Sequence, residues 1–475
     1  MLNFLDDKIL RIFGDLAVDK RLTRLDVVSR LPKFIAEYLI SKYYRSDPNT
    51  WLEKLTRIVN EFFPDPKDRE KVLSKAVHEG KVMLIDEYEA YVDLKLGLYF
   101  LRIPNLQIND ALVDQALVRK YDRLFNGVWG IGVLRYRPDI VDFSKANKWG
   151  KTPTPLQLVE FEPFQAYNID LRAFIEARHH FALPEWIDML IKSIGLNPNM
   201  YAHRQKLLLL VRLVPLIEGN VNILELGPRA TGKTYLYRNI SYYTRIYAGG
   251  TVSAARLFYD ARLKILGDIG QRDAVIFDEI ARVKFTNPDE VVAKLKDYMV
   301  DGFFERGPLK RAHSTCSLVF IGNIELVSYS TPDNIISYLP DFLKDTAMLD
   351  RIHGLLPGWE LPKIQKSDIH LAQGYGLASD YLSEILHKMR DISFEALVEQ
   401  HFESGSNFTI RDEKAVKKLL SGLLKVLFPH GTFDKKELAE IAELVAGLRQ
   451  NVVNILSTLS PAEFPRKSLI IRVRG

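Results

Sequence analysis

Only one cysteine, Cys316, is present among 475 residues, which excludes an internal disulfide framework and a metal site built on several thiolates. No apolar run approaches the roughly 18 residues that a membrane-spanning helix requires. The N-terminus, Met1 to Lys8, lacks the basic segment, apolar core and small residues of a secretory leader. We therefore expect a cytoplasmic protein with no membrane partner.

The sequence also lacks a large excess of one charge, because its 65 Lys and Arg and 60 Asp and Glu leave a net charge of only +5. The two signs are mixed along most of the chain, so this excess permits a nucleic-acid partner without requiring one. The sequence has no internal repeat and no low-complexity tract. Its hydrophobic content of 47% is enough for packed cores, and its length predicts about three domains.

The spacing of apolar residues predicts the order of the domains. Helical spacing up to residue 78 changes at Lys81 to a strand-like pattern rich in Val, Leu, Tyr and Phe, which favours a small barrel of the oligonucleotide-binding (OB) kind. Strands and helices then alternate, and the C-terminal part is nearly all helical before a short strand or tail. The predicted parts are an N-terminal helical domain (1–78), a β-rich OB-like DNA-binding domain (79–155), a helical connector (156–204), an α/β core (205–374) and a helical lid with the C-terminal tail (375–475).

The stretch GPRATGKT fits the phosphate-binding pattern G-x-x-x-x-G-K-[ST]. A predicted strand, Asn222 to Leu226, precedes it and a predicted helix follows from Tyr235, which is the context that the pattern requires. In such a loop the backbone N–H groups face phosphates, the lysine adds a positive charge and the hydroxyl binds Mg²⁺. The alternative is a chance glycine-rich turn. The expected ATP and Mg²⁺ contacts are Gly227, Pro228, Arg229, Ala230, Thr231, Gly232, Lys233 and Thr234.

Two adjacent acids follow a second apolar run, Ala274 to Phe277. In a parallel sheet the carboxyl ends of the strands face the ligand. We therefore expect Asp278 to bind Mg²⁺ and Glu279 to act as the general base that polarises the attacking water. The alternative is a buried strand that ends in an acidic turn.

A third apolar run, Ser317 to Gly322, ends in Asn323. If this strand lies between the other two, the amide of Asn323 lies beside the terminal phosphate and can orient the water. An asparagine after a strand is also a common turn residue, so this role depends on the strand order.

These motifs together resemble the AAA+ ATPases, which form rings and supply an arginine from one subunit to the nucleotide of the next. Leu349 to Ile352 is similar to the arginine-finger box of that family and makes Arg351 the candidate. Phe408 to Asp412 is similar to the second-sensor motif of the minichromosome maintenance helicases and makes Arg411 the candidate sensor. Each arginine could instead belong to a surface ion pair. The difference matters, because an arginine finger can raise the rate by orders of magnitude.

A hairpin is predicted between the two acids and the amide. Phe303 to Arg306 and Ala312 to Ser317 have strand composition on either side of a Gly-Pro turn, with Lys310 and Arg311 near its tip. The minichromosome maintenance helicases carry a DNA-gripping hairpin at this position. Charged residues on a hairpin can equally protect a solvated edge.

Further candidate DNA contacts lie around the end of the β-rich domain. They are Lys145, Lys148 and Lys151 beside Trp149, and Arg135 and Arg137 beside Tyr136. A polar linker is lysine-rich for solubility alone, and aromatic residues on a strand more often pack in a core than stack on a base.

Longer strings carry a more specific resemblance, and it covers essentially the whole chain. IEARHHFALPEWIDMLIKSIGLNP, LVRLVPLIEGNVNILELGPRATGKT, VIFDEIARVKF, KDYMVDGFFERG and LPGWELPK are similar to the BrxL family, the Lon-related AAA+ components of BREX phage-defence systems. The resemblance implies an N-terminal DNA-binding region, a helicase-like ATPase core, a hexameric or heptameric ring, single or stacked, around double-stranded DNA, and contacts with other BREX components. Members commonly continue into a Lon-type peptidase domain with a Ser-Lys dyad. This sequence stops at Gly475, so we expect no peptidase activity from it.

The function predicted first is an ATP-hydrolysing motor or clamp on duplex DNA in antiviral defence, held by backbone contacts that weaken with salt. Two alternatives stay open: a protein-remodelling ATPase that serves a separate peptidase, and a nucleotide-switched scaffold. Exposed aromatic residues on the hairpin would favour remodelling, whereas Lys310 and Arg311 favour nucleic acid. Glu279 argues against a scaffold that scarcely hydrolyses ATP.

Overall fold

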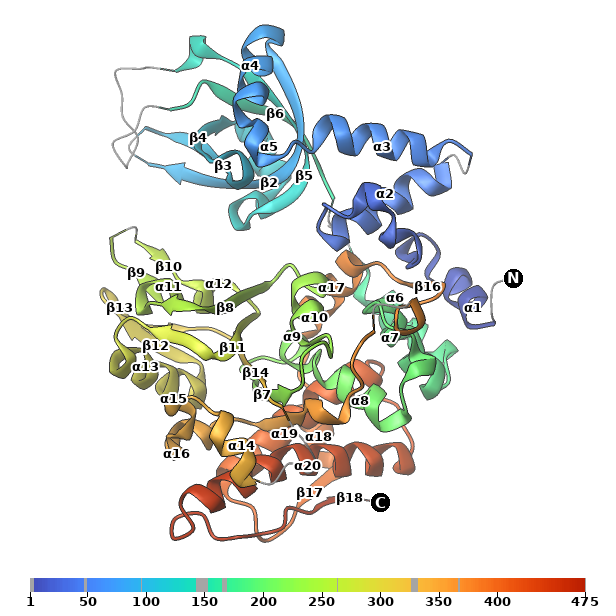
Figure 1. Ribbon diagram of the computed structural model, residues 1–475, viewed down its shortest axis with the longest axis vertical. Helices are drawn as coiled ribbons and strands as arrows, with labels where there is room; N and C mark the ends of the chain where they lie inside the picture. Colours follow the sequence, from blue (N-terminus) through green and yellow to red (C-terminus); the bar gives the residue numbers. More distant parts are fainter. Residues whose placement is uncertain are drawn as a thin grey trace. The chain divides into compact units, whose positions relative to one another are not determined.

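The computed structural model describes residues 4–46, 49–94, 96–141, 153–164, 169–262, 264–325, 332–365 and 368–474. The chain divides into two compact units, one of residues 21–169 and a larger one that joins residues 1–20 to residues 170–475 (Figure 1). Within the described ranges, no helix is long and apolar enough to cross a membrane.

The smaller unit combines helices with a β-barrel. Its helices are α2 (Lys33–Ser46), α3 (Trp51–Phe62), α4 (Arg69–Glu79) and α5 (Gln115–Lys120). Over its described residues, the barrel closes in the order β2-β3-β4-β6-β5, with β2 (Lys81–Asp93), β3 (Leu98–Ile103), β4 (Ile108–Val113), β5 (Val128–Tyr136) and β6 (Leu156–Pro163). The interior requires glycine on β5, because a Cβ on Gly132 would lie 2.7 Å from the side chains of Leu158 and Tyr88.

Two of the predicted domain boundaries differ from the structure. The β-rich part does not end at residue 155, because β6 begins at Leu156 and closes the barrel by pairing with both β4 and β5. The first residues do not belong with the N-terminal helical domain, because β1 (Ala17–Asp19) pairs with β16 (Tyr375–Leu377) of the larger unit. Both differences arise from pairings between distant residues, which local apolar spacing does not reveal.

The larger unit is built on a parallel sheet, which confirms the predicted parallel-sheet core with flanking helices. Over its described residues, the strand order is β15-β7-β14-β11-β8. The strands are β7 (Asn222–Gly227), β8 (Thr244–Val252), β11 (Ala274–Phe285), β14 (Ser317–Asn323) and β15 (Gly354–Pro357). The centre of the sheet consists of continuous buried runs of Val, Ile, Leu and Phe, as expected for strands covered on both faces.

Helices before and between these strands form most of the rest of the ATPase-type core. They are α1 (Phe4–Phe13), α6 (Leu171–Ala177), α7 (Leu183–Ser193), α8 (His203–Val211), α9 (Val214–Ile217), α10 (Lys233–Ile240), α11 (Ala254–Leu257), α12 (Asp268–Gln271), α13 (Pro288–Asp301), α14 (Pro332–Tyr338), α15 (Asp341–Lys344) and α16 (Thr346–Leu349). Two small hairpins belong to the same part: β9 (Tyr259–Asp260) with β10 (Ile265–Leu266), and β12 (Phe303–Arg306) with β13 (Leu309–His313).

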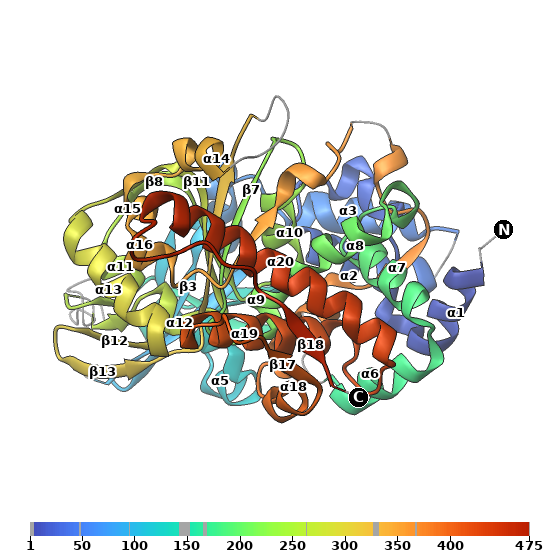
Figure 2. The same cartoon turned by 90° about the horizontal axis from the view of Figure 1, so that it is seen from below.

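The C-terminal helices are α17 (Ser379–Met389), α18 (Glu395–His401), α19 (Ile410–Leu427) and α20 (Lys435–Leu459). Figure 2 shows α20 running across the strands, and its Val452 and Leu456 share a buried cluster with Leu224 and Phe320 of the sheet. The predicted short strand at the end of the chain is confirmed, since β18 (Ile471–Val473) pairs with β17 (Phe402–Ser404). The C-terminal helices are therefore packed onto the core and are not an independent unit.

Candidate nucleotide-binding site

The phosphate-loop sequence forms the connection between β7 and α10. A cavity of about 430 Å³ opens there, and its lining is Arg229, Ala230, Thr231, Gly232, Lys233, Thr234, Tyr235, Asp278, Glu279, Arg282 and Asn323. Ala230 and Gly232 adopt positive φ angles of 64° and 76°, which curl the loop around the cavity. Gly227 lets the loop approach residue 358 closely, because a Cβ there would lie 2.6 Å from the backbone of Gly358.

Lys233 is the first residue of α10 and is 5% exposed. Its Nζ donates to the carbonyl oxygens of Gly227 at 2.9 Å and Pro228 at 2.7 Å, so the amine closes the loop on itself. Burial lowers the pKa of Lys233. An anion in the cavity would offset that effect, because a nearby negative charge favours the protonated amine.

Thr234 and Asp278 meet at the mouth of the loop. The Thr234 hydroxyl donates to Asp278 Oδ2 at 2.7 Å, and Asp278, which is 8% exposed, is the last residue of β11 before its pairing with β8 becomes irregular. Mg²⁺ is usually held by one or two protein oxygens together with substrate phosphates. A hydroxyl and a carboxylate side by side at a phosphate loop therefore fit this ion, as the sequence predicts.

Glu279 lies at an irregular point of β11. Its φ angle is 50°, its N–H donates to Asp278 Oδ1 at 2.9 Å, and the pairing of β11 with β8 shifts between Asp278 and Val283. A bulge of this kind re-aims a side chain, and the Glu279 side chain lines the cavity. The sequence predicted that the strand ends at the acidic pair, whereas β11 continues through the bulge to Phe285.

Arg282 is a site residue that sequence reasoning missed. Its Nη1 donates to Glu279 Oε2 at 3.2 Å, and it also lines the cavity. The sequence analysis placed the end of the strand at the acidic pair, so Arg282, three residues after Glu279, was not considered. The bulge brings the guanidinium back to the carboxylate of Glu279.

Asn323 is the last residue of β14, and β14 lies between β7 and β11 as the role proposed for Asn323 requires. Its neighbour in the register is Gly227 at the start of the phosphate loop. The side chain is exposed and lines the same cavity as Lys233 and Glu279. The strand order therefore brings the loop, the acids and the amide to one edge of the sheet.

Arg351 and Arg411 lie together elsewhere and are not in the cavity lining. Arg411 pairs with Asp350, and Arg351 donates to the carbonyl of Ala347. Burial lowers the pKa of Arg351, and the neighbouring positive charge of Arg411 lowers it further. Asp350 is also bound by Arg449 of α20, a fully buried side chain that the sequence did not single out. The two candidate arginines therefore lie close enough to influence each other, and Asp350, the ion-pair partner of Arg411, also attracts Arg351 electrostatically.

The predicted hairpin is present as β12 and β13, but its second strand is shifted and ends at His313, whereas Ser317 begins β14. The second strand begins at Leu309 and not at Ala312, so Lys310 and Arg311 lie in β13, one and two residues beyond the tip pair Arg306 and Leu309. Both are exposed, and the Arg311 guanidinium lies 4.1 Å from the centre of the Phe303 ring.

The second hairpin of the larger unit, β9 with β10, lies beside this one in Figure 1, and Arg306 donates to the carbonyl of Tyr259.

Of the candidate contacts near the barrel, Lys145, Lys148, Lys151 and Trp149 lie outside the described residues. Arg137 pairs with Asp139 at 2.8 Å, and Tyr136 packs against the barrel core. Arg135 is exposed on β5.

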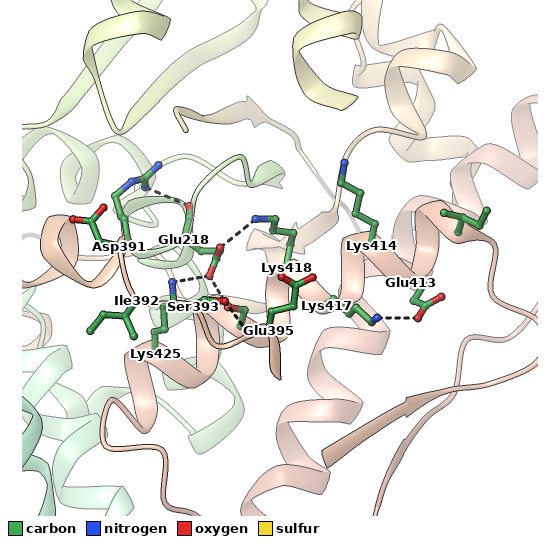
Figure 3. Close-up of a pocket in the computed structure, with 13 residues that line it drawn as sticks. Glu218, Asp391, Ile392, Ser393, Glu395, Glu413, Lys414, Lys417, Lys418 and Lys425 are labelled. Atoms are coloured by element: carbon green, nitrogen blue, oxygen red, sulfur yellow. Dashed lines mark hydrogen bonds and ion pairs between the residues drawn. The ribbon is translucent and has the colours of Figure 1, made fainter. Parts of the chain in front are cut away.

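A larger cavity of about 530 Å³ lies between α19 and residues 390–395 (Figure 3). Its side chains converge on Glu218, which accepts from Lys418 at 3.2 Å, Lys425 at 2.9 Å and Ser421 at 2.5 Å. Burial opposes the charge of Glu218, but these donors hold its pKa below the usual value. Lys418 and Lys425 thus neutralise an internal carboxylate, and the lining of this cavity is separate from the phosphate loop.

The parallel sheet, its phosphate loop, the Asp278 carboxylate beside the Thr234 hydroxyl and the Asn323 amide in the same cavity together define a P-loop ATPase domain. Two family models match this chain: "Lon-like protease BrxL-like, ATPase domain" over residues 156–469, and "BREX system Lon protease-like protein BrxL N-terminal" over residues 11–136. The chain therefore belongs to the BrxL family, which confirms the resemblance found in its sequence.

Individual relatives agree with this assignment. The chain is 33% identical over 468 residues to "Lon-like protease BrxL" of Escherichia coli O9:H4 (strain HS), covering 97% of this chain and 66% of that protein. It is 33% identical over 469 residues to the protein of the same name in Bacillus cereus (strain H3081.97), covering 97% and 68%. "Uncharacterized protein 440" of Sulfolobus islandicus rod-shaped virus 1 is 25% identical over 340 residues, covering 62% of this chain and 74% of that protein. The chain thus spans about two thirds of the length of the two BrxL relatives.

Proposed function

We propose that this protein binds ATP with Mg²⁺, hydrolyses it, and acts as a DNA-binding ring protein in BREX-type antiviral defence. The observation that carries the enzymatic part is the single cavity shared by Lys233, the Thr234–Asp278 pair, Glu279 and Asn323. These residues supply a cation, an oxygen pair for a divalent ion, a base and an amide within reach of one phosphate chain.

Each side chain has a distinct task in this proposal. The loop N–H groups and Lys233 bind the phosphates, and Thr234 with Asp278 holds Mg²⁺, which when bound neutralises phosphate charge. Glu279 takes a proton from water, and Asn323 orients that water. Arg282 donates to Oε2 of Glu279 at 3.2 Å and so competes with the water for that oxygen.

Glu279→Gln tests the catalytic assignment, because it preserves the volume and removes the charge. We expect ATP affinity to stay near the wild-type value while hydrolysis falls by about 10²–10⁴-fold. Nucleotide binding is measured by calorimetry and turnover by phosphate release. Unchanged turnover would remove Glu279 from the role of base.

The DNA part of the proposal is supported by the exposed cations Lys310 and Arg311 on β13. Contacts of Lys and Arg with phosphates give affinity that falls steeply with salt. Assembly into a hexameric or heptameric ring would let Arg351 and Arg411 of one subunit reach the nucleotide of the next. In such a ring the hairpin would contact duplex DNA. The ring on DNA would then bind other BREX components.

The ATPase rate with and without duplex DNA, at low and moderate salt, tests this part. We expect stimulation that fades with salt and that is weakened by Lys310→Ala with Arg311→Ala. Lys435→Ala with Lys436→Ala removes the same charge from exposed positions on α20 and should leave stimulation unchanged. Turnover indifferent to DNA would favour protein remodelling, and equal stimulation in the hairpin variant would remove the hairpin from the DNA path.

A further inference from the structure

A buried arginine stands directly behind the phosphate loop. Arg212, which follows α8, is 1% exposed and forms a two-pronged pair with the fully buried Glu225 of β7. Its Nη2 lies 2.6 Å from Glu225 Oε1, and its Nε lies 3.1 Å from Glu225 Oε2. Glu225 therefore holds the planar guanidinium group of Arg212 against β7, the strand that leads into the loop.

The remaining nitrogen of Arg212 reaches the loop itself. Nη1 donates to the carbonyl oxygen of Thr231 at 3.0 Å. In a planar trans peptide the carbonyl and the following N–H point in opposite directions. Because Arg212 binds the Thr231 carbonyl, the N–H of Gly232 points away from Arg212. It therefore faces the cavity that Thr231 and Gly232 line.

A second donor acts on the preceding peptide. The N–H of Ile364 donates to the carbonyl of Ala230 at 2.7 Å, and Lys233 takes the carbonyls of Gly227 and Pro228. Carbonyl oxygens at four positions of the loop are thus bound by donors of the chain. This arrangement matters because a carbonyl turned toward the cavity would repel a phosphate, whereas an N–H attracts it.

Direct attraction of phosphate does not explain Arg212. Its charge is matched by Glu225 at hydrogen-bond distance, and the two act in opposite directions on the pKa of Lys233. Stability does not explain the pair well either, because a buried ion pair is often no more stabilising than apolar side chains of similar volume. Unlike apolar residues, the pair supplies an N–H donor that is held in a fixed direction at the Thr231 carbonyl.

We propose that Arg212 is a positioning residue for nucleotide binding: anchored by Glu225, it holds the Thr231–Gly232 peptide so that its N–H faces the phosphates. This inference rests on the proposed function, since it concerns the same nucleotide site. It adds two residues, Arg212 and Glu225, that lie outside the cavity lining and outside the phosphate-loop pattern.

The test measures the Kd for ADP with Mg²⁺ and the thermal midpoint of the full chain. Arg212→Met with Glu225→Met removes both charges at similar volume, and we expect a folded protein whose Kd is at least about tenfold higher. Arg212→Lys can neutralise Glu225 but lacks the fork that also reaches Thr231, so we expect a midpoint near wild type and a Kd several-fold higher. In both variants KM for ATP should rise more than kcat falls.

A matched control removes another buried ion pair from the same unit. Lys192 donates to Asp6 at 2.6 Å, and both are buried, so Lys192→Met with Asp6→Met makes the same kind of replacement away from the loop and should leave the Kd unchanged.

If the double methionine variant is unfolded, Arg212→Lys decides the question. Wild-type affinity in folded Arg212→Lys or in the folded double variant overturns the inference and leaves the proposed function standing. Failure of the wild-type chain to bind ADP or ATP overturns the proposed function itself.

Discussion

Replacing Arg449 by methionine should destabilise the larger unit strongly, because Arg449 is the centre of a buried ionic cluster. Its side chain is fully buried, its Nε donates to Asp412 Oδ1 at 2.9 Å, and its Nη2 donates to Asp350 Oδ1 at 2.8 Å. Its Nη1 donates to the carbonyls of Asp350 at 3.2 Å and Ile352 at 2.5 Å. Arg449→Met would leave two buried carboxylates without their shared partner.

The size of the loss follows from two independent estimates. Removing one partner of a buried ion pair costs about 3–5 kcal/mol. The Asp412 carboxylate gives a second figure: burial opposes its charge, yet Arg449 together with Lys467 and Thr409 lowers its pKa from 3.8 to about 2. At about 1.36 kcal/mol for each pKa unit, that difference corresponds to about 2 kcal/mol, which Arg449 shares with Lys467 and Thr409. We expect the unfolding free energy to fall by about 3–5 kcal/mol.

Calorimetric and urea-induced unfolding of the full chain measure this loss. Arg466→Met, an exposed arginine nearby in sequence, is the matched control and should change stability by no more than about 0.5 kcal/mol. A double-mutant cycle of Arg449→Met and Asp412→Asn isolates the interaction between these two residues. We expect a coupling free energy of about 2 kcal/mol. Additive effects of Arg449→Met and Asp412→Asn would refute the ionic explanation.

The acid dependence supplies a further check on the same pair. Because the pKa of Asp412 is lower in the folded state than in the unfolded state, its stabilisation is present above about pH 4 and is lost as the pH falls toward 2. The stability difference between wild type and Asp412→Asn should shrink over that window. A difference that stays constant from pH 5 to about pH 2 would contradict the assignment.

Other predictions concern the site and its support. Thr234→Ala should raise the Mg²⁺ concentration needed for half-maximal ATPase activity about tenfold, and Thr234→Ser should restore it. Asn323→Ala should lower kcat by about 10–100-fold with little change in KM, as measured by steady-state kinetics. Gly227→Ala should lower the thermal midpoint and weaken ADP binding, because its Cβ would lie 2.6 Å from the Gly358 backbone. Burial and Arg449 lower the pKa of His353 to about 3, so stability should decline as the pH falls from about 6.5 toward 3, and His353→Gln should flatten that decline in thermal unfolding.

Much of the nucleotide site could be predicted from sequence because its residues follow strands directly. The phosphate loop, Asp278 and Asn323 each follow an apolar run, and the ends of such runs in parallel strands meet at one edge of a sheet. The confirmed order β7-β14-β11 places Asn323 between the loop and the acids. The roles of these residues in catalysis stay predictions.

Arg282 and Arg212 could not be found in the same way. Arg282 reaches Glu279 only because β11 passes through a bulge, and the bulge depends on pairing with β8. Arg212 lies in the segment before β7 and bonds to Thr231, and no sequence motif links these two residues. Arg351 and Arg411 were each identified by a local motif, but the pairing of Arg411 with Asp350 and the buried Arg449 that also binds Asp350 were not.

The sequence by itself determined the phosphate loop, the apolar strands, the acids at their ends and the membership of the BrxL family. These features are local, because hydrophobic period and short motifs involve residues within about one helix or strand of each other. Only the tertiary structure decided that β6 closes the barrel, that residues 4–20 pack with the larger unit, and that Arg212 stands behind the loop. Those contacts join residues distant in sequence, and their free energy comes from burial and pairing that exist only once the chain is folded.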